Sequence, residues 1–375
     1  MNLKISVDEE CFSEKEKTFL TFGNLEVSSF KYETGVCALR FKNNIGYFVA
    51  LPFKGQMIWD AFFNNRLLTM KSTFKEPRNV ESFEDSFGCF MMHCGALRTG
   101  NPGLEDDHPP HGELPYANYE QAEIICGNDE KGNYIGLTGS YTYNKAFGDY
   151  YCAHPLVKMY EKSSLLNISI KIDNLANKPM ELMYMCHVNF RPVDFGRIVQ
   201  TADWSSKSMK IRTDIPPLRR DIQVKAQTKE YMTLISKLAD DPKTTNAFKP
   251  EDIYKDFYDP EIVFFINSPV TDTEGWAHFM QIHPDGSADY VSYKPRELDH
   301  CARWIVRTKD QEALGLALPS TCDPEGYSAE KKKGNIKEIP PKGSFSASVV
   351  AGYLGKEEAY DKERQIEKMM SRDQK

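Results

Sequence analysis

Hydrophobic and polar residues alternate along many short stretches of this chain. In LLNISIKID (165–173), four apolar side chains, Leu166, Ile168, Ile170 and Ile172, alternate with polar ones. Successive side chains of a β-strand point to opposite faces, so this period of two predicts a strand with one buried face. SFSASVV (344–350) repeats the pattern, and strand-like runs recur at 45–53, 55–63, 88–94, 121–127, 134–143, 181–190, 261–267, 277–282, 302–307 and 312–318.

Helical patterns are few and lie at the margins of these strands. KEYMTLISKLADD (229–241) precedes Pro242, and GKEEAYDKERQIEKMM (355–370) is rich in strong helix formers. Many short strands without regular strand–helix alternation favour an all-β, antiparallel sandwich over a doubly wound sheet. We expect one domain over 1–375, with the sandwich at about 25–353, a probable insertion at 216–260 and a C-terminal helix at 355–375.

Composition narrows the classes of partner. The formal net charge is −7 and the pI about 5.7, so no basic surface favours nucleic acid or an anionic membrane. No stretch has the length and hydropathy of a signal peptide or a membrane span, which predicts a cytoplasmic protein. The nine cysteines are scattered without a CxxC pair, which indicates free thiols in a reducing compartment.

One motif, HPPHGELPY (108–116), could carry chemistry. His108, His111 and Glu113 offer two imidazoles and a carboxylate, and His93 or His187 could add a metal ligand in space. The two prolines exclude the helical spacing of many zinc sites. A histidine pKa near 6.5 also suits proton transfer at neutral pH, so the motif alone leaves metal binding, acid–base chemistry and a structural turn open.

Several segments, taken together, resemble galactose mutarotase-like proteins of the aldose 1-epimerase-related type. The resemblance begins with GQMIWDAFFNNRLL (55–68) and continues in 87–116, where Cys94-Gly95-Ala96, Gly103, His111-Gly112 and Pro115 stand at matching places. CHVNF (186–190) is similar to the strand that carries the second histidine of the family, and 302–326 is similar to its closing segment. The matches cover about 45–195 and 300–326 in the same order.

This resemblance implies an antiparallel β-supersandwich with a sugar in a groove on one sheet face. It also implies that a carboxylate and a histidine move protons while the ring of the sugar opens and closes, without a cofactor. His187 would be the general acid and His111 would contact the ring region of the sugar. Further substrate-binding candidates are Arg66, Arg98, Asn189, Trp59 and His93, and the aromatic residues Phe190 and Tyr116 could pack on the sugar.

The chain departs from the family pattern at the general base. The family has a glutamate before a proline in its closing strand, whereas here Leu318 precedes Pro319. A leucine cannot accept a proton, so we expect Glu113, or Asp323 or Glu325 with a shifted register, to supply the carboxylate. Alternatively, His93, His108, His111 and Glu113 hold a divalent metal ion.

Three functions follow from these observations. The first is an aldose 1-epimerase-like isomerase (mutarotase) that interconverts anomers or epimers of a monosaccharide or modified sugar with His187 and His111. The second is a metal-assisted isomerase, epimerase or lyase acting on an oxidised or uncommon sugar in the same groove. The third is a sugar-binding protein without catalysis, because the base residue is missing. The identity of the sugar and the oligomeric state leave no readable pattern.

Overall fold

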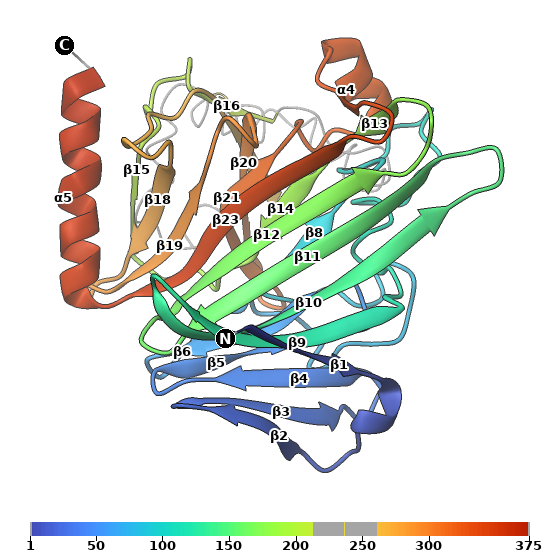
Figure 1. Cartoon of the computed structure of the whole chain (residues 1–375). Coiled ribbons are helices and arrows are strands. Elements are labelled where there is room, and N and C mark those ends of the chain that lie inside the picture. Colours follow the sequence, from blue (N-terminus) through green and yellow to red (C-terminus); the bar gives the residue numbers. More distant parts are fainter. Residues whose placement is uncertain (1, 213–235, 237–260, 374–375) are drawn as a thin grey trace.

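Two large antiparallel sheets make up the protein (Figure 1). The computed structural model describes residues 2–212, 236 and 261–373, so the predicted helix at 229–241 and most of the predicted insertion lie outside the described residues. The first sheet has nine strands, in the spatial order β1 (Asn2–Val7), β9 (Gln121–Asp129), β10 (Gly132–Asn144), β11 (Tyr150–Tyr160), β12 (Leu165–Asn174), β23 (Ser344–Leu354), β19 (Ala288–Tyr293), β18 (Ala277–Ile282) and β15 (Arg197–Gln200).

The second sheet has twelve strands. Its order is β16 (Met209–Ile211), β17 (Glu261–Ile266), β20 (His300–Arg307), β21 (Glu312–Ser320), β14 (Met185–Val188), β8 (Met91–Cys94), β6 (Ile58–Phe63), β5 (Gly46–Ala50), β4 (Cys37–Lys42), β3 (Leu25–Lys31) and β2 (Lys17–Phe22), and β7 (Arg66–Leu67) pairs with β6. A small sheet joins β13 (Met180–Leu182) to β22 (Lys337–Ile339). The all-β sandwich prediction is confirmed, although β1 and β2 lie before the expected start near residue 25.

Helices are short or peripheral in the part of the chain that the structure describes. A 3₁₀ turn, η1, spans Glu9–Cys11, α4 spans Tyr327–Lys333, and α5 spans Lys356–Asp373. The position of α5 agrees with the predicted C-terminal helix, and Figure 1 shows it beside β15 and β18. No helix among the described residues is long and apolar enough to cross a membrane.

The core lies between the two sheets. Because side chains alternate along a strand, β14 and β20 place apolar residues both in this core and on the outer face of the twelve-stranded sheet. Cys186 and Val188 of β14 belong to the main core cluster, whereas Met185 belongs to a second cluster on the outer face of the sheet. In β20, Ile305 lies in the main core and Ala302 in the second cluster. The outer face is therefore apolar as well and needs a cover.

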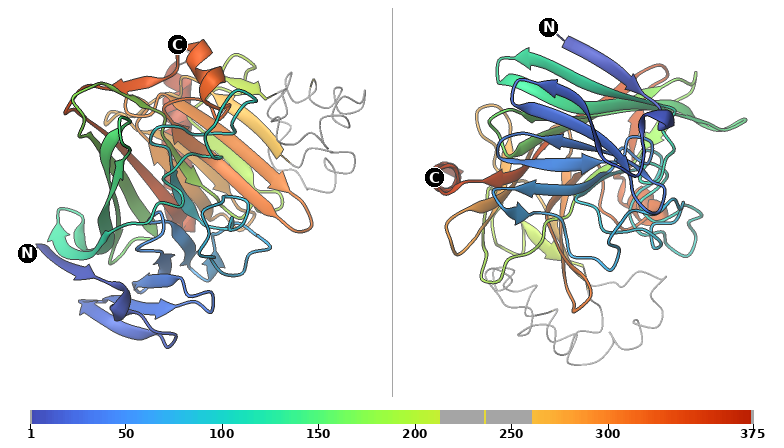
Figure 2. Two further views of the ribbon diagram at one scale, coloured as in Figure 1. Left: turned by 90° about the vertical axis from the view of Figure 1, so that its right-hand side faces the viewer. Right: turned by 90° about the horizontal axis from the view of Figure 1, so that it is seen from below.

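Two loop regions cover this outer face. Phe74, Phe83 and Phe87, from the segment between β7 and β8, pack into the second cluster, and Tyr116 joins them from the segment between β8 and β9. Figure 2 shows these blue and teal loops running across the strands. The covered face of the twelve-stranded sheet is where a cavity remains.

The cysteines are free thiols, as the sequence predicts. Eight are buried, and Cys11 is partly exposed. Burial raises the pKa of the thiols of Cys89 and Cys186 to about 12. The thiols of Cys89 and Cys186 are therefore protonated and unreactive in the folded protein.

Candidate functional site

A cavity of about 290 Å³ lies between the outer face of the twelve-stranded sheet and the covering loops. This volume is close to the lower end of ligand pockets, which run from roughly 300 to 1,000 Å³. Strands β14, β21, β20 and β17 form its floor, and the loops form its walls. Its lining consists of Met70, Phe74, Phe83, Glu84, Phe87, Asn101, His111, Met185, His187, Arg212, Glu261, Val263, Ala302, Trp304, Val306, Gln311, Leu318 and Pro324.

His187 reaches the cavity from β14, where it is paired with Met92 of β8. Asn189 donates its amide N–H to the carbonyl of Cys89 at 3.1 Å, so its Oδ1 faces the Nδ1 of His187 at 2.6 Å. An amide oxygen only accepts, and Nδ1 must therefore carry the proton. The neutral ring consequently keeps a lone pair on Nε2.

His111 enters the cavity from the loop opposite the sheet. Its backbone has φ of 61°, and its N–H donates to the carbonyl of Gly100 at 2.9 Å while its carbonyl accepts from Gly95 at 3.0 Å. Gly112 follows with φ of 81°, and a Cβ there would lie 2.0 Å from the Arg98 carbonyl oxygen. This tight crossing of two loop segments fixes the direction of the His111 side chain.

The two imidazoles meet inside the cavity. Their ring centroids lie 5.1 Å apart and the planes are nearly perpendicular, at 85°. Burial lowers the pKa of His111 to about 4, and burial together with the neighbouring His111 lowers the pKa of His187 to about 3. Both rings are therefore neutral at physiological pH. Among the described residues, the buried Nδ1 of His111 has no hydrogen-bond partner, so this polar atom is available to a ligand.

A carboxylate that the sequence analysis missed faces His187 from the far side of the floor. Glu261, the first residue of β17, accepts a hydrogen bond from Trp304 Nε1 at 2.9 Å and contacts Arg212 at 3.5 Å. The Trp304 ring lies 5.4 Å from the His187 ring, and the charge of Glu261 acts to raise the pKa of His187. Glu261 and Val263 are two residues apart on β17 and both line the cavity, so the period of two in this strand was the sequence signal that could have placed Glu261 in the site.

Leu318 lies in the floor itself. It is 2% exposed and pairs with Ala302 of β20. The position before Pro319, where the resemblance implies a glutamate, is therefore in the cavity wall and apolar.

None of the three carboxylates expected as candidate bases, Glu113, Asp323 and Glu325, lines this cavity. Glu113 Oε1 accepts hydrogen bonds from the backbone N–H groups of Ala96 and Leu97 and from the hydroxyl of Tyr151, at 2.6–3.0 Å. It thereby holds the loop that leads to His111. Glu325 binds Lys333 instead.

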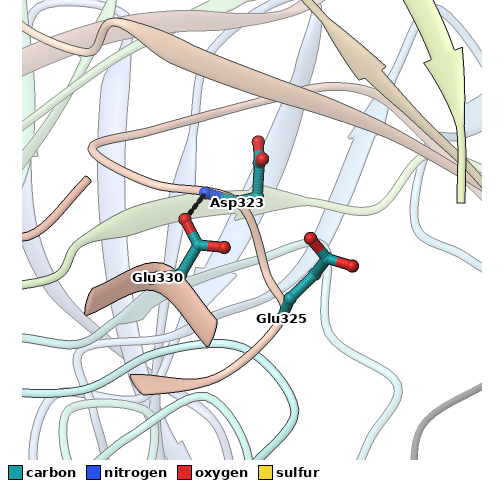
Figure 3. Close-up of side chains that lie close together, drawn as sticks. All are labelled: Asp323, Glu325 and Glu330. Atoms are coloured by element: carbon teal, nitrogen blue, oxygen red, sulfur yellow. Dashed lines mark hydrogen bonds between the residues drawn. The ribbon is translucent and has the colours of Figure 1, made fainter. Parts of the chain in front are cut away.

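Glu325 belongs to an acidic cluster with Asp323 and Glu330, shown in Figure 3. The ammonium group of Lys333 contacts all three carboxylates, and Glu330 also accepts the backbone N–H of Asp323 at 2.9 Å. Glu330 and Lys333 both belong to α4. The cluster ties α4 to the segment that carries Pro324, a residue of the cavity wall.

The two expected arginines are committed to other partners. Arg66 contacts the buried Asp289 at 3.3 Å and the carbonyl of Arg191 at 3.1 Å. Arg98 contacts Glu181 at 3.1 Å and stacks over the ring of Tyr327. Neither arginine lines the cavity, and Arg212 is the arginine that does among the described residues.

The remaining expected residues also lie outside the cavity wall. Trp59 is 2% exposed and packs within the second apolar cluster. Asn189 contacts His187 through its Oδ1 and does not line the cavity itself. Phe190 is a core residue, and Tyr116 donates to the Ser86 carbonyl at 2.5 Å. The aromatic rings of the cavity are instead those of Phe74, Phe83, Phe87 and Trp304.

The expected set of metal ligands does not form one site. Buried His93 uses Nδ1 to bond the hydroxyl of Tyr184 at 2.7 Å, whereas Glu113 is held by the loop backbone. His108 has a largely buried side chain whose Nδ1 donates to the Pro109 carbonyl at 2.9 Å. Only His111 of this set lines the cavity.

Comparison with solved structures shows the same fold in other proteins. A Klebsiella pneumoniae protein named as a putative aldose 1-epimerase matches with a TM-score of 0.79 and 14% identity, over 99% of this chain and 96% of that one. A galactose mutarotase-like protein from Clostridium acetobutylicum matches with a TM-score of 0.55 and 13% identity, over 89% and 99%. A galactose mutarotase related enzyme from Lactobacillus acidophilus gives 0.53 and 12%, over 85% and 98%.

Sequence comparisons add nothing to this result. No family model matches the chain, and no curated protein matches it.

Proposed function

Because the chain has the galactose mutarotase-like fold, we propose that it is a carbohydrate-active enzyme that interconverts the anomers or epimers of a sugar by proton transfer. One observation carries the proposal: two neutral imidazoles from distant segments face each other in one cavity. The aromatic rings of that cavity suit the apolar C–H faces of a sugar ring.

His187 has the protonation state of a base. Its Nε2 lone pair accepts the proton of the anomeric hydroxyl, the C1–O5 bond breaks as C1–O1 becomes a carbonyl, and the resulting His187 imidazolium gives that proton to O5 as the aldehyde forms. After rotation about C1–C2, the reverse steps close the ring with the opposite configuration. His187 is therefore the general acid only after it has first accepted a proton.

Neighbouring groups stabilise the charge that His187 acquires. Asn189 Oδ1 accepts the Nδ1–H, and the negative charge of Glu261 favours the imidazolium. His111, neutral as well, offers a ring N–H to the sugar oxygen that takes up the proton. In this arrangement Glu261 compensates for the leucine at position 318.

The test is the rate of anomer exchange, followed by polarimetry or NMR, for a broad panel of aldoses. We expect acceleration by the protein, and a loss of about 10²- to 10⁴-fold in kcat for His187→Ala. His278→Ala is the matched control, because His278 is equally buried but lies on β18 of the other sheet. An absence of acceleration for every sugar contradicts the proposal.

Non-catalytic sugar binding is the second candidate, and Leu318 favours it, because the residue that resembles the family's base position is apolar. It predicts a rise in Tm with a sugar that the protein leaves unchanged. Measurable exchange that depends on His187 contradicts it.

A further inference from the structure

The floor of the cavity carries a continuous apolar strip. Met185, Leu318, Ala302 and Val263 come from β14, β21, β20 and β17, which are consecutive neighbours in the sheet. Each is at most 4% exposed, and all belong to the second apolar cluster. None of these side chains can donate a hydrogen bond, and the weakly accepting sulfur of Met185 is the one acceptor among the four.

Polar groups occupy other parts of the lining. Apart from the two histidines and the Arg212–Glu261 pair, they are Glu84 and Asn101, from the covering loops, and Gln311, from the turn between β20 and β21. Among the described residues, a ligand therefore finds polar partners on the loops, at His187 and at the Arg212–Glu261 pair, and none on the four side chains of the strip. A hydroxyl directed at the strip would lose its water without gaining a partner, which is costly.

We propose that the substrate is a deoxy sugar, whose exocyclic methyl group packs on the strip formed by Met185, Leu318, Ala302 and Val263. The inference rests on the proposed function and names the substrate class of the same site. A methyl group is the substituent of such a sugar that matches aliphatic side chains, while the ring hydroxyls face the histidines and the loops. Leu318 is thus a specificity-determining residue.

The experiment compares matched pairs of hexoses that differ by one hydroxyl. They are D-fucose with D-galactose, D-quinovose with D-glucose, L-fucose with L-galactose and L-rhamnose with L-mannose. In the pair that the protein accelerates most, we expect kcat/KM for the 6-deoxy sugar to be higher, by roughly tenfold to a hundredfold. An equal or higher value for the hydroxymethyl sugar overturns the inference and leaves the proposed function intact.

If the protein accelerates no sugar, the proposed function fails, and binding then decides the inference. Saturation-transfer NMR with the same pairs should show tighter binding of the 6-deoxy sugar, with the strongest saturation on its methyl group. Equal binding within each pair, or no binding, overturns the inference.

Substitutions in the strip provide the second arm. Leu318→Gln places a donor and an acceptor in the floor and should reduce or reverse the preference for the methyl group. Ala302→Ser is a smaller change that tests the same point if Leu318→Gln fails to fold. Val350→Thr is the matched control, because it replaces a half-buried apolar residue on β23 of the other sheet. An unchanged preference in both strip variants counts against the inference.

Discussion

At the scale of residues, the partners of His187 determine what it can do. Asn189 fixes the proton on Nδ1. Burial lowers the pKa of the ring, so the ring stays neutral at a pH far below the ordinary pKa of histidine. The same chemistry cannot be deduced from the letters CHVNF, since they state neither the burial nor the orientation of the amide. Resemblance alone predicted that residues 111 and 187 would share a site.

The pH dependence of activity follows from the lowered pKa values of His187, about 3, and His111, about 4. A base must be deprotonated, so kcat/KM should stay flat from pH 7 to about 5 and fall only as the pH approaches 4. Initial rates of anomer exchange, with circular dichroism as a check on folding, measure this profile. An acid limb centred near 6.5 would show that the histidines titrate as exposed residues do.

Stability should depend on pH through buried His93, whose pKa burial lowers to about 4. Below about pH 6.5 the unfolded chain binds a proton at His93 that the folded protein does not bind. The contribution of His93 to stability therefore falls as the pH drops from about 6.5 to 4, and it is fully present above that window. His93→Gln should reduce the slope of the unfolding free energy by up to about 1.4 kcal/mol per pH unit. Urea unfolding at several pH values measures it, and Met92→Leu should keep the slope of the parent.

At the scale of elements, the alternation of apolar and polar residues predicted the strands, whereas no sequence pattern predicted the loops that cover the cavity. β12 and β23 follow their predicted patterns closely, because each presents one face to the core. Glu261 was missed although its strand was predicted, since only the pairing of β17 with β20 brings it beside Trp304. Arg66 and Arg98 were chosen by residue type, and their ion pairs with distant carboxylates leave no local pattern.

Gly112 tests the loop that presents His111. In Gly112→Ala the new Cβ would lie 2.0 Å from a backbone oxygen, so the loop must shift and move His111. We expect a loss of more than about 2 kcal/mol of stability and a reduced kcat. Gly275→Ala is the control, because Gly275 has a similar φ of 83° and nothing within 4 Å of the added Cβ. Equal effects in thermal unfolding and activity would contradict this account.

At the scale of the whole molecule, the cavity and α5 lie on different parts of the sandwich. Ala359 and Ile366 of α5 pack on a separate apolar cluster that includes Met280 and Leu354 of the nine-stranded sheet. The predicted class and the C-terminal helix needed only pattern and composition. The position of the cavity needed the order of strands in space, which the sequence does not state.

Deletion of residues 356–375 should therefore separate stability from activity. Loss of the buried Ile366 and its neighbours should lower the free energy of unfolding by at least about 2 kcal/mol, while kcat stays within about twofold. Chemical denaturation and the exchange assay measure the two quantities on the same sample. A large fall in kcat with unchanged stability would place α5 in the site.

The distribution of cysteines allows the rate of local opening to be measured in several strands of the protein. With eight thiols sealed inside and protonated, a maleimide or disulfide reagent added in excess can modify them only when the surrounding region opens. Mass spectrometry after timed quenching would then assign an opening rate to each of β4, β8, β9, β11, β14 and β20 in the unmodified chain. Local opening of the protein can thus be mapped without introducing a cysteine by mutation.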